Sequence, residues 1–147
     1  MLKRILFSIL IFTSSYMMAS NLPIKNQDVS PKQLESQNKQ ILTLVVNELS
    51  KNLPKKIDDY TNFIKIEAKN TKLIYTFEIN TGSKSDESII KEDHKRMKKS
   101  ITNGVCRSSK RFLDAQITIV YKYISASSKN ELFKFEIAQK DCLVYSK

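Results

Sequence analysis

The chain has 147 residues and a formal net charge of +10, because 25 lysine and arginine residues face 15 aspartate and glutamate residues. This length predicts a single domain. With only two glycines, the chain lacks the glycine-rich loop in which nucleotide-binding proteins cradle phosphate, so we expect no nucleotide cofactor.

The first twenty residues have the layout of a secretory signal peptide. Lys3 and Arg4 precede an apolar run at 5–12, and a smaller, more polar segment follows up to residue 20. The run is shorter than the roughly 20 apolar residues that a transmembrane helix needs. We therefore expect a signal peptide at 1–20. The alternative is that this segment stays uncleaved as an anchor.

The polar segment 21–29 is predicted to be a flexible leader, and 30–147 to be one α+β domain. No cysteine lies near the predicted cleavage region, so lipid attachment is not expected. An exported protein rarely meets nucleic acid. The basic charge therefore favours an anionic envelope component or an acidic protein partner.

A helix is predicted to begin after Ser30, which can cap it, with Pro31 at the first helical position and Gln33 completing a capping box. Apolar residues at helical spacing continue to about Asn52. The helix is expected to end there, because the residue before Pro54 disfavours the helical conformation.

Two strand-like runs follow, at 64–68 and 73–79, with alternating apolar and polar residues around a short polar turn. This pattern predicts an antiparallel hairpin. Two further alternating runs, at 117–123 and 133–137, predict a second hairpin of the same kind.

A second helix is predicted between the hairpins, because Ser85 can cap it and acidic residues follow at its positive end. Its expected end is at Asn103-Gly104. The predicted apolar stripe is Ile90, His94, Met97, Ile101 and Val105. The order helix, hairpin, helix, hairpin predicts a four-stranded antiparallel sheet with the helices packed on one face.

Cys106 and Cys142 are the only cysteines, one after the second helix and one after the last strand. In an oxidising compartment they are expected to form a structural disulfide. The alternative, a redox-active pair, usually places its cysteines close together as C-x-x-C, which is not the case here.

The residues offer little for catalysis. His94 is the only histidine, and the positions three and four residues away on its helix are not metal ligands. The S-x-x-K pairs of a serine–lysine hydrolase occur about as often as chance predicts. Tyr121, Tyr123, Phe133 and Phe135 are expected to face the helices as core. We therefore predict that the protein is not an enzyme and holds no metal or cofactor.

The second helix is unusually basic. A charged helical face opposite an apolar stripe is ordinarily only the solvated side, but here cations far outnumber acids, whereas surface ion pairs would have balanced them. We therefore assign possible partner binding to this helix, at Lys91, Lys95, Arg96, Lys98 and Lys99.

Two groups of residues carry a resemblance over about residues 50–142. The first is Leu53-Pro54 with Ile57-Asp58; the second is Cys106, Tyr121-Lys122-Tyr123 and Asp141-Cys142. In these features the chain resembles a group of small, uncharacterised exported bacterial proteins. The resemblance implies an envelope protein and does not imply a particular activity.

These observations together predict a non-enzymatic binding or accessory protein, periplasmic or secreted, that acts through a basic surface. A pilotin-like role in secretion or pilus assembly is one version. An inhibitor or immunity protein of an envelope-acting toxin is an alternative. A small hydrolase of envelope polymers is the alternative from a different class.

Overall fold

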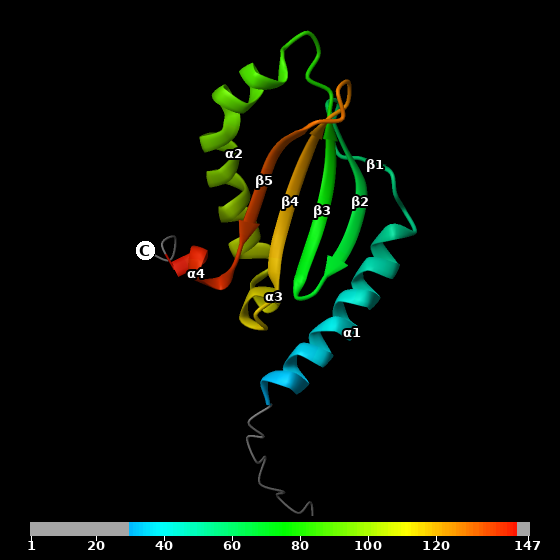
Figure 1. The fold of residues 1–147 in the computed structure, drawn as a ribbon, viewed down its shortest axis with the longest axis vertical. Helices are drawn as coiled ribbons and strands as arrows, with labels where there is room; N and C mark the ends of the chain where they lie inside the picture. The colour runs from blue at the N-terminus through cyan, green and yellow to red at the C-terminus, as the bar shows by residue number, and fades with distance from the viewer. Residues whose placement is uncertain (1–29, 144–147) are drawn as a thin grey trace, which may run out of the picture.

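The computed structural model of the protein describes residues 30–143, so the predicted signal peptide and leader lie outside the described residues. Four helices and five strands follow one another along this part of the chain (Figure 1). In chain order they are α1 (Pro31–Ser50), β1 (Lys55–Lys56), β2 (Thr61–Lys69), β3 (Lys72–Ile79), α2 (Asp86–Ser108), α3 (Lys110–Asp114), β4 (Thr118–Ser125), β5 (Glu131–Ile137) and α4 (Gln139–Cys142).

The strands form one mixed sheet in the order β1-β2-β3-β4-β5. The two predicted hairpins are present as β2–β3 and β4–β5, both antiparallel. The prediction of a four-stranded, wholly antiparallel sheet is wrong, because β3 and β4 are parallel and β1 adds a fifth strand. Parallel neighbours need a long crossover, and α2 with α3 supplies it. The alternating patterns identify each hairpin but carry no signal for how two hairpins join.

The two faces of the sheet differ in chemistry. One face is apolar and aromatic, and the helices pack on it; its buried residues include Leu73, Ile119, Phe133 and Phe135. The other face carries lysine–glutamate pairs that cross between strands, such as Lys72 with Glu136 on β5. Alternation along each strand sends successive side chains to opposite faces, so one face forms the core and the other is mostly solvated, with Val120 buried on it.

The predicted start of α1 is confirmed. The Ser30 hydroxyl accepts a hydrogen bond from the Gln33 main-chain nitrogen at 3.3 Å, and the Gln33 side-chain oxygen accepts one from the Ser30 main chain at 3.1 Å. This helix packs mainly on β2 and buries Asn38 and Leu42. It lies beside the β2 side of the sheet in Figure 1.

α2 packs mainly on β5, at the opposite side of the sheet (Figure 1). Its sheet-facing ridge is Asp93, Met97, Ile101 and Val105, at steps of four residues. The predicted stripe is therefore wrong in its first turns. Ile90 and His94 are exposed there, and Ile89 is partly buried instead. A ridge at strict four-residue steps drifts around the helix, since 3.6 residues make one turn.

The predicted end of α2 at Asn103-Gly104 is also wrong, because the helix continues to Ser108. Val105 is 2% exposed and Cys106 is tied to another element, so packing outweighs the helix-breaking tendency of Gly104. The short helices α3 and α4 were not predicted. They anchor Leu113 in the core and place Cys142 beside α2. Among the described helices, none is both long enough and apolar enough to span a bilayer.

Candidate binding groove

A band of aromatic rings crosses the middle of the helix-covered face of the sheet. The centroid of Phe77 in β3 lies 5.1 Å from that of Phe63 in β2 and 5.1 Å from that of Tyr123 in β4. Tyr75 and Tyr121 stack in the same way at 5.3 Å. The register explains these contacts, because Tyr75 is paired with Tyr121 and Phe77 with Tyr123 across the parallel strands. Cross-strand aromatic pairs of this kind stabilise a sheet.

The helices leave part of this band uncovered. α1 packs on β2 and α2 on β5, which are three strand spacings or about 14 Å apart. Two helices in direct contact lie only about 8–10 Å apart. A gap between them therefore follows from the arrangement, and Phe77 and Tyr121 under it are only partly buried.

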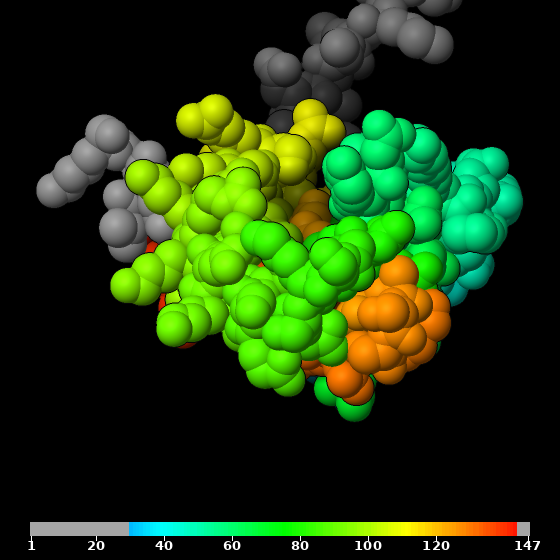
Figure 2. Space-filling model, turned by 90° about the horizontal axis from the view of Figure 1, so that it is seen from above, coloured from blue at the N-terminus to red at the C-terminus, as the bar shows by residue number. Residues whose placement is uncertain are grey.

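A groove of about 490 Å³ occupies this gap. Figure 2 shows the hollow from above, between the turquoise segment that follows α1 and the yellow-green helix α2. Its floor is formed by aromatic and aliphatic side chains of β3 and β4, and one wall by Met97 and Ile101 of α2. The full lining is Ile57, Asp58, Thr61, Phe77, Ile79, Arg96, Met97, Ser100, Ile101, Tyr121 and Tyr123.

The rim of the groove is polar. On the α2 side, Arg96 reaches Asp93 with a nitrogen–oxygen distance of 2.6 Å. On the other side, the Asp58 carboxylate accepts a hydrogen bond from the Tyr60 main-chain nitrogen at 2.8 Å. That hydrogen bond holds the pKa of Asp58 below its ordinary value. The groove thus has an apolar floor with a cation and an anion at its mouth.

The tyrosines of the aromatic band are held neutral. Burial, with a smaller contribution from Tyr121, raises the pKa of Tyr75 to about 12. Burial also raises the pKa of Tyr121 and that of Tyr123 above the ordinary tyrosine value. Neutral phenols present a largely apolar surface with a polar tip. This chemistry suits contact with apolar side chains.

The five predicted partner-binding residues all lie on α2 and are exposed. Only Arg96 lies at the groove. Lys91, Lys95, Lys98 and Lys99 lie elsewhere on the helix surface and are considered separately below. The sequence prediction therefore missed the groove itself. Its signal was the Tyr121-Lys122-Tyr123 pattern. The predicted core position is confirmed for Tyr123, which is buried, whereas Tyr121 is only partly buried.

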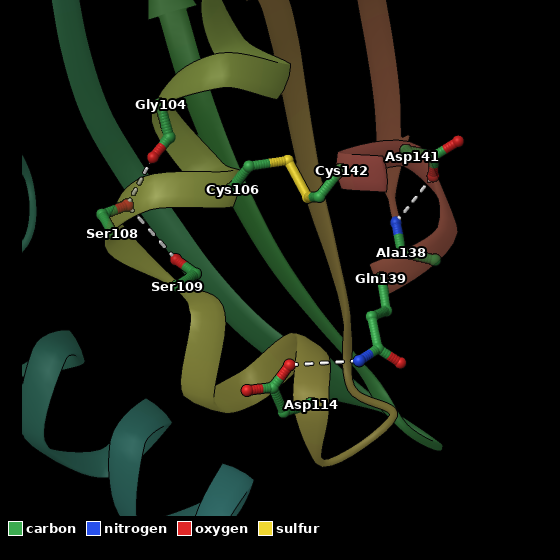
Figure 3. Close-up of a disulfide and its surroundings, with 9 residues drawn as sticks. All are labelled: Gly104, Cys106, Ser108, Ser109, Asp114, Ala138, Gln139, Asp141 and Cys142. Carbon is green, nitrogen blue, oxygen red and sulfur yellow. Dashed lines mark hydrogen bonds between the residues drawn. A yellow bond between two sulfur atoms is a disulfide. The ribbon is translucent and has the colours of Figure 1, made fainter. Parts of the chain in front are cut away.

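The predicted disulfide between Cys106 and Cys142 is present, with the two Cα atoms 5.5 Å apart (Figure 3). It joins α2 to α4 and so fixes the end of the chain that follows β5. A hydrogen bond of 3.1 Å from the Gln139 amide to Asp114 adds a second tie (Figure 3). A cavity of about 310 Å³ beside the disulfide includes Lys110 and Asp114, which pair with each other.

His94 lies at the edge of the sheet-facing side of α2. It is exposed, and its ring centroid is 5.4 Å from that of Phe135 in β5. Between residues 30 and 143, no three histidine, cysteine, aspartate or glutamate side chains are grouped in a way that could hold a metal ion. In the described part of the chain, the structure groups apolar and aromatic side chains, rather than convergent titratable groups, into its central groove.

Comparison with known proteins gives a similarity of fold alone. No protein-family model and no curated protein matches the chain. Among solved structures, a presumed secreted protein of Pseudomonas aeruginosa superimposes with a TM-score of 0.66 at 13% identity, covering 74% of this chain and 96% of the other.

Two pilotins of type 2 secretion systems also share the fold. EpsS of Vibrio vulnificus gives a TM-score of 0.59 at 15% identity and covers 76% of this chain and 96% of its own. AspS of Vibrio cholerae gives a TM-score of 0.56 at 13% identity and covers 76% of this chain and 97% of its own. At these identities the similarity extends to the architecture and not to individual residues.

Proposed function

We propose that the protein is a non-enzymatic, exported accessory protein that binds an amphipathic helix of a protein partner in the aromatic groove. The observation that carries the proposal is that Phe77 and Tyr121, beside the buried Tyr123, are left partly uncovered between α1 and α2. A concave apolar surface with a few polar groups at its rim is the usual form of a binding site.

The position of the groove favours a helix over an extended segment. Its floor is formed by β3 and β4, and each of these strands is already paired with a neighbour on both sides. The floor therefore offers no free strand edge with which an incoming strand could pair. A buried segment must satisfy its own main-chain hydrogen bonds, and a helix does so internally. Its apolar face would then insert between Met97 and Tyr121, as in other helix-in-groove complexes.

Three features support the exported, accessory part of the proposal. The sequence at 1–20 has the layout of a signal peptide. The Cys106–Cys142 disulfide suits an oxidising compartment. The proteins that share the fold are a presumed secreted protein and two pilotins. A pilotin-like role in an envelope assembly is the version that we favour.

Selection from a displayed library of random peptides tests the groove directly. We expect the selected sequences to carry apolar residues at three- and four-residue spacing, the pattern of one helix face. Binding of these peptides, measured by fluorescence anisotropy, should fall at least about tenfold in Tyr121→Ala, since a central aromatic contact commonly contributes 2 kcal/mol or more.

Lys122→Ala is the matched control, because Lys122 is the next residue of β4 and pairs with Glu131 on the opposite face of the sheet. It should bind the selected peptides as the wild type does. The proposal is wrong if the selected peptides lack a helical apolar pattern, or if Tyr121→Ala and Lys122→Ala bind them equally well. Thermal unfolding of both variants establishes that each is folded.

A further inference from the structure

Lysines form a row along the side of α2 that points away from the sheet. Lys91, Lys95 and Lys99 follow one another at steps of four residues, and all three are exposed. Each lies two residues from a member of the sheet-facing ridge. At 100° per residue, this places each lysine about 200° around the helix axis from that ridge residue. Arg107 continues the row about two turns beyond Lys99. Lys98, the neighbour of Lys99 in sequence, lies beside the row. We name these five residues the basic row: Lys91, Lys95, Lys98, Lys99 and Arg107.

The charge of the basic row is not neutralised by neighbouring acids. Within residues 30–143, none of the five side chains takes part in an ion pair. The two acidic residues in the same stretch of helix are already engaged. Glu92 pairs with Lys84 at 2.7 Å, and Asp93 pairs with Arg96.

The outer face of the sheet shows the opposite arrangement. There Lys65 pairs with Glu67, Lys122 with Glu131, and Lys134 with Glu136. Lysine enrichment of the whole chain therefore does not by itself explain the basic row, because Lys65, Lys122 and Lys134 on the sheet all have acidic partners. Within residues 30–143, cations without an ion pair cluster on α2, whereas the others, such as Lys32, Lys55 and Lys69, are spread over different elements.

The shape and chemistry of the row fit a plane of negative charge. From Lys91 to Arg107 the helix rises about 24 Å at 1.5 Å per residue. The four lysines of the row lie on the convex surface of the helix, whereas Arg107 at its end lines the cavity beside the disulfide. Four of its five members are lysines, whose compact ammonium groups need no fixed fork of acceptors, whereas specific recognition of carboxylates favours arginine. An acidic protein partner would thus find little geometric specificity here.

We propose that the basic row binds the anionic headgroups of a phospholipid bilayer. Positive side chains near such a surface contribute roughly equal, largely additive attractions. The groove opens on the flank of the same helix, at Arg96 and Ser100. Docking through the basic row would therefore hold the groove beside the membrane surface. The proposal does not depend on what the groove binds.

Vesicle co-sedimentation of the full chain tests this proposal. We expect binding to vesicles that contain phosphatidylglycerol, weakening steeply as salt rises, and much weaker binding to vesicles of phosphatidylcholine alone. The triple variant Lys91→Gln/Lys95→Gln/Lys99→Gln should bind the anionic vesicles about a hundredfold more weakly, at roughly fivefold per lysine. The wild type and the triple variant both contain the apolar segment at 5–12, so this segment does not account for a difference in their vesicle binding.

The matched control is Lys65→Gln/Lys122→Gln/Lys134→Gln, which removes the same charge from the outer face of the sheet. That face lies on the far side of the sheet from α2, and at 0.1 M salt the Debye length is only about 10 Å, so its charges are largely screened from a bilayer bound at the row. We therefore expect its affinity to change by less than about threefold. Equal losses in the two triple variants would overturn the proposal, as would equal binding to both kinds of vesicle. Tyr121→Ala should keep its vesicle binding, so failure of the groove and failure of the basic row are distinguishable.

Discussion

The side-chain amide of Asn38 in α1 donates a hydrogen bond of 2.7 Å to the main-chain oxygen of Ala115, which follows α3. The two residues are 77 positions apart in the chain. Asn38 is 2% exposed, and with Leu42 it is one of two buried residues of α1. This contact ties the first helix to the crossover between the two hairpins, and the chain beyond α1 supplies Ile57, Asp58 and Thr61 to one side of the groove.

Asn38→Ala should lower the free energy of unfolding by about 1–3 kcal/mol, because the partly buried Ala115 carbonyl loses its donor. Urea denaturation measures the change. The exposed neighbour Gln37 gives the control, and Gln37→Ala should stay within about 0.5 kcal/mol of the wild type. Equal effects of the two substitutions would show that the hydrogen bond is not important for docking α1.

Leu42 and Leu44 form a matched pair on α1. Leu42 is 0% exposed, whereas Leu44 is 69% exposed. Leu42→Ala should therefore cost about 2–5 kcal/mol through lost burial and a residual cavity, while Leu44→Ala should change the free energy of unfolding by less than about 0.5 kcal/mol. A large effect at Leu44 would mean that α1 packs with its other side against the sheet.

Removal of the disulfide should destabilise the folded protein strongly. The bond spans a sequence separation of 36 residues, and the chain-entropy model gives about 4 kcal/mol for a closed loop of this size. Chemical denaturation of Cys106→Ala/Cys142→Ala, compared with the wild type before and after reduction, measures the loss. The variant and the reduced wild type should agree. If the variant instead matches the oxidised wild type, the disulfide does not contribute to stability.

The tyrosines of the aromatic band predict an alkaline loss of stability. Burial raises the pKa of Tyr75 to about 12, above its ordinary value of 10.0. A tyrosine whose pKa is raised by folding releases its proton more readily when unfolded, so unfolding becomes easier as the pH rises. The stability is fully present below about pH 10 and is lost between pH 10 and about pH 12.

Urea denaturation across this pH range, together with ultraviolet absorbance of the phenolates, checks the prediction. Tyr121→Phe should reduce the loss, because one titrating group is removed and Tyr75 loses a neighbour that raises its pKa. Constant stability across the range, or tyrosine absorbance that titrates alike in the folded and the unfolded protein, would contradict it.

Local pattern was sufficient to place most of the secondary structure. The capping residues at Ser30 and Ser85, and the period-2 runs of the four main strands, depend on neighbours in the chain and are visible in the sequence. The errors have a common cause. The end of α2 lies beyond Gly104 because Val105 and Cys106 are held by residues distant in sequence.

The sequence by itself determined the class of the protein: its basic charge, its two hairpins, its pair of cysteines and the lysines along α2. Only the tertiary structure decided that β3 lies parallel to β4 and that Tyr121 lies in a groove. The physical reason is that hydrophobic alternation shows which side chains leave water, but not which partner covers them. Coverage depends on where α1 and α2 cross the sheet, and their separation across β3 and β4 is a property of the assembled fold.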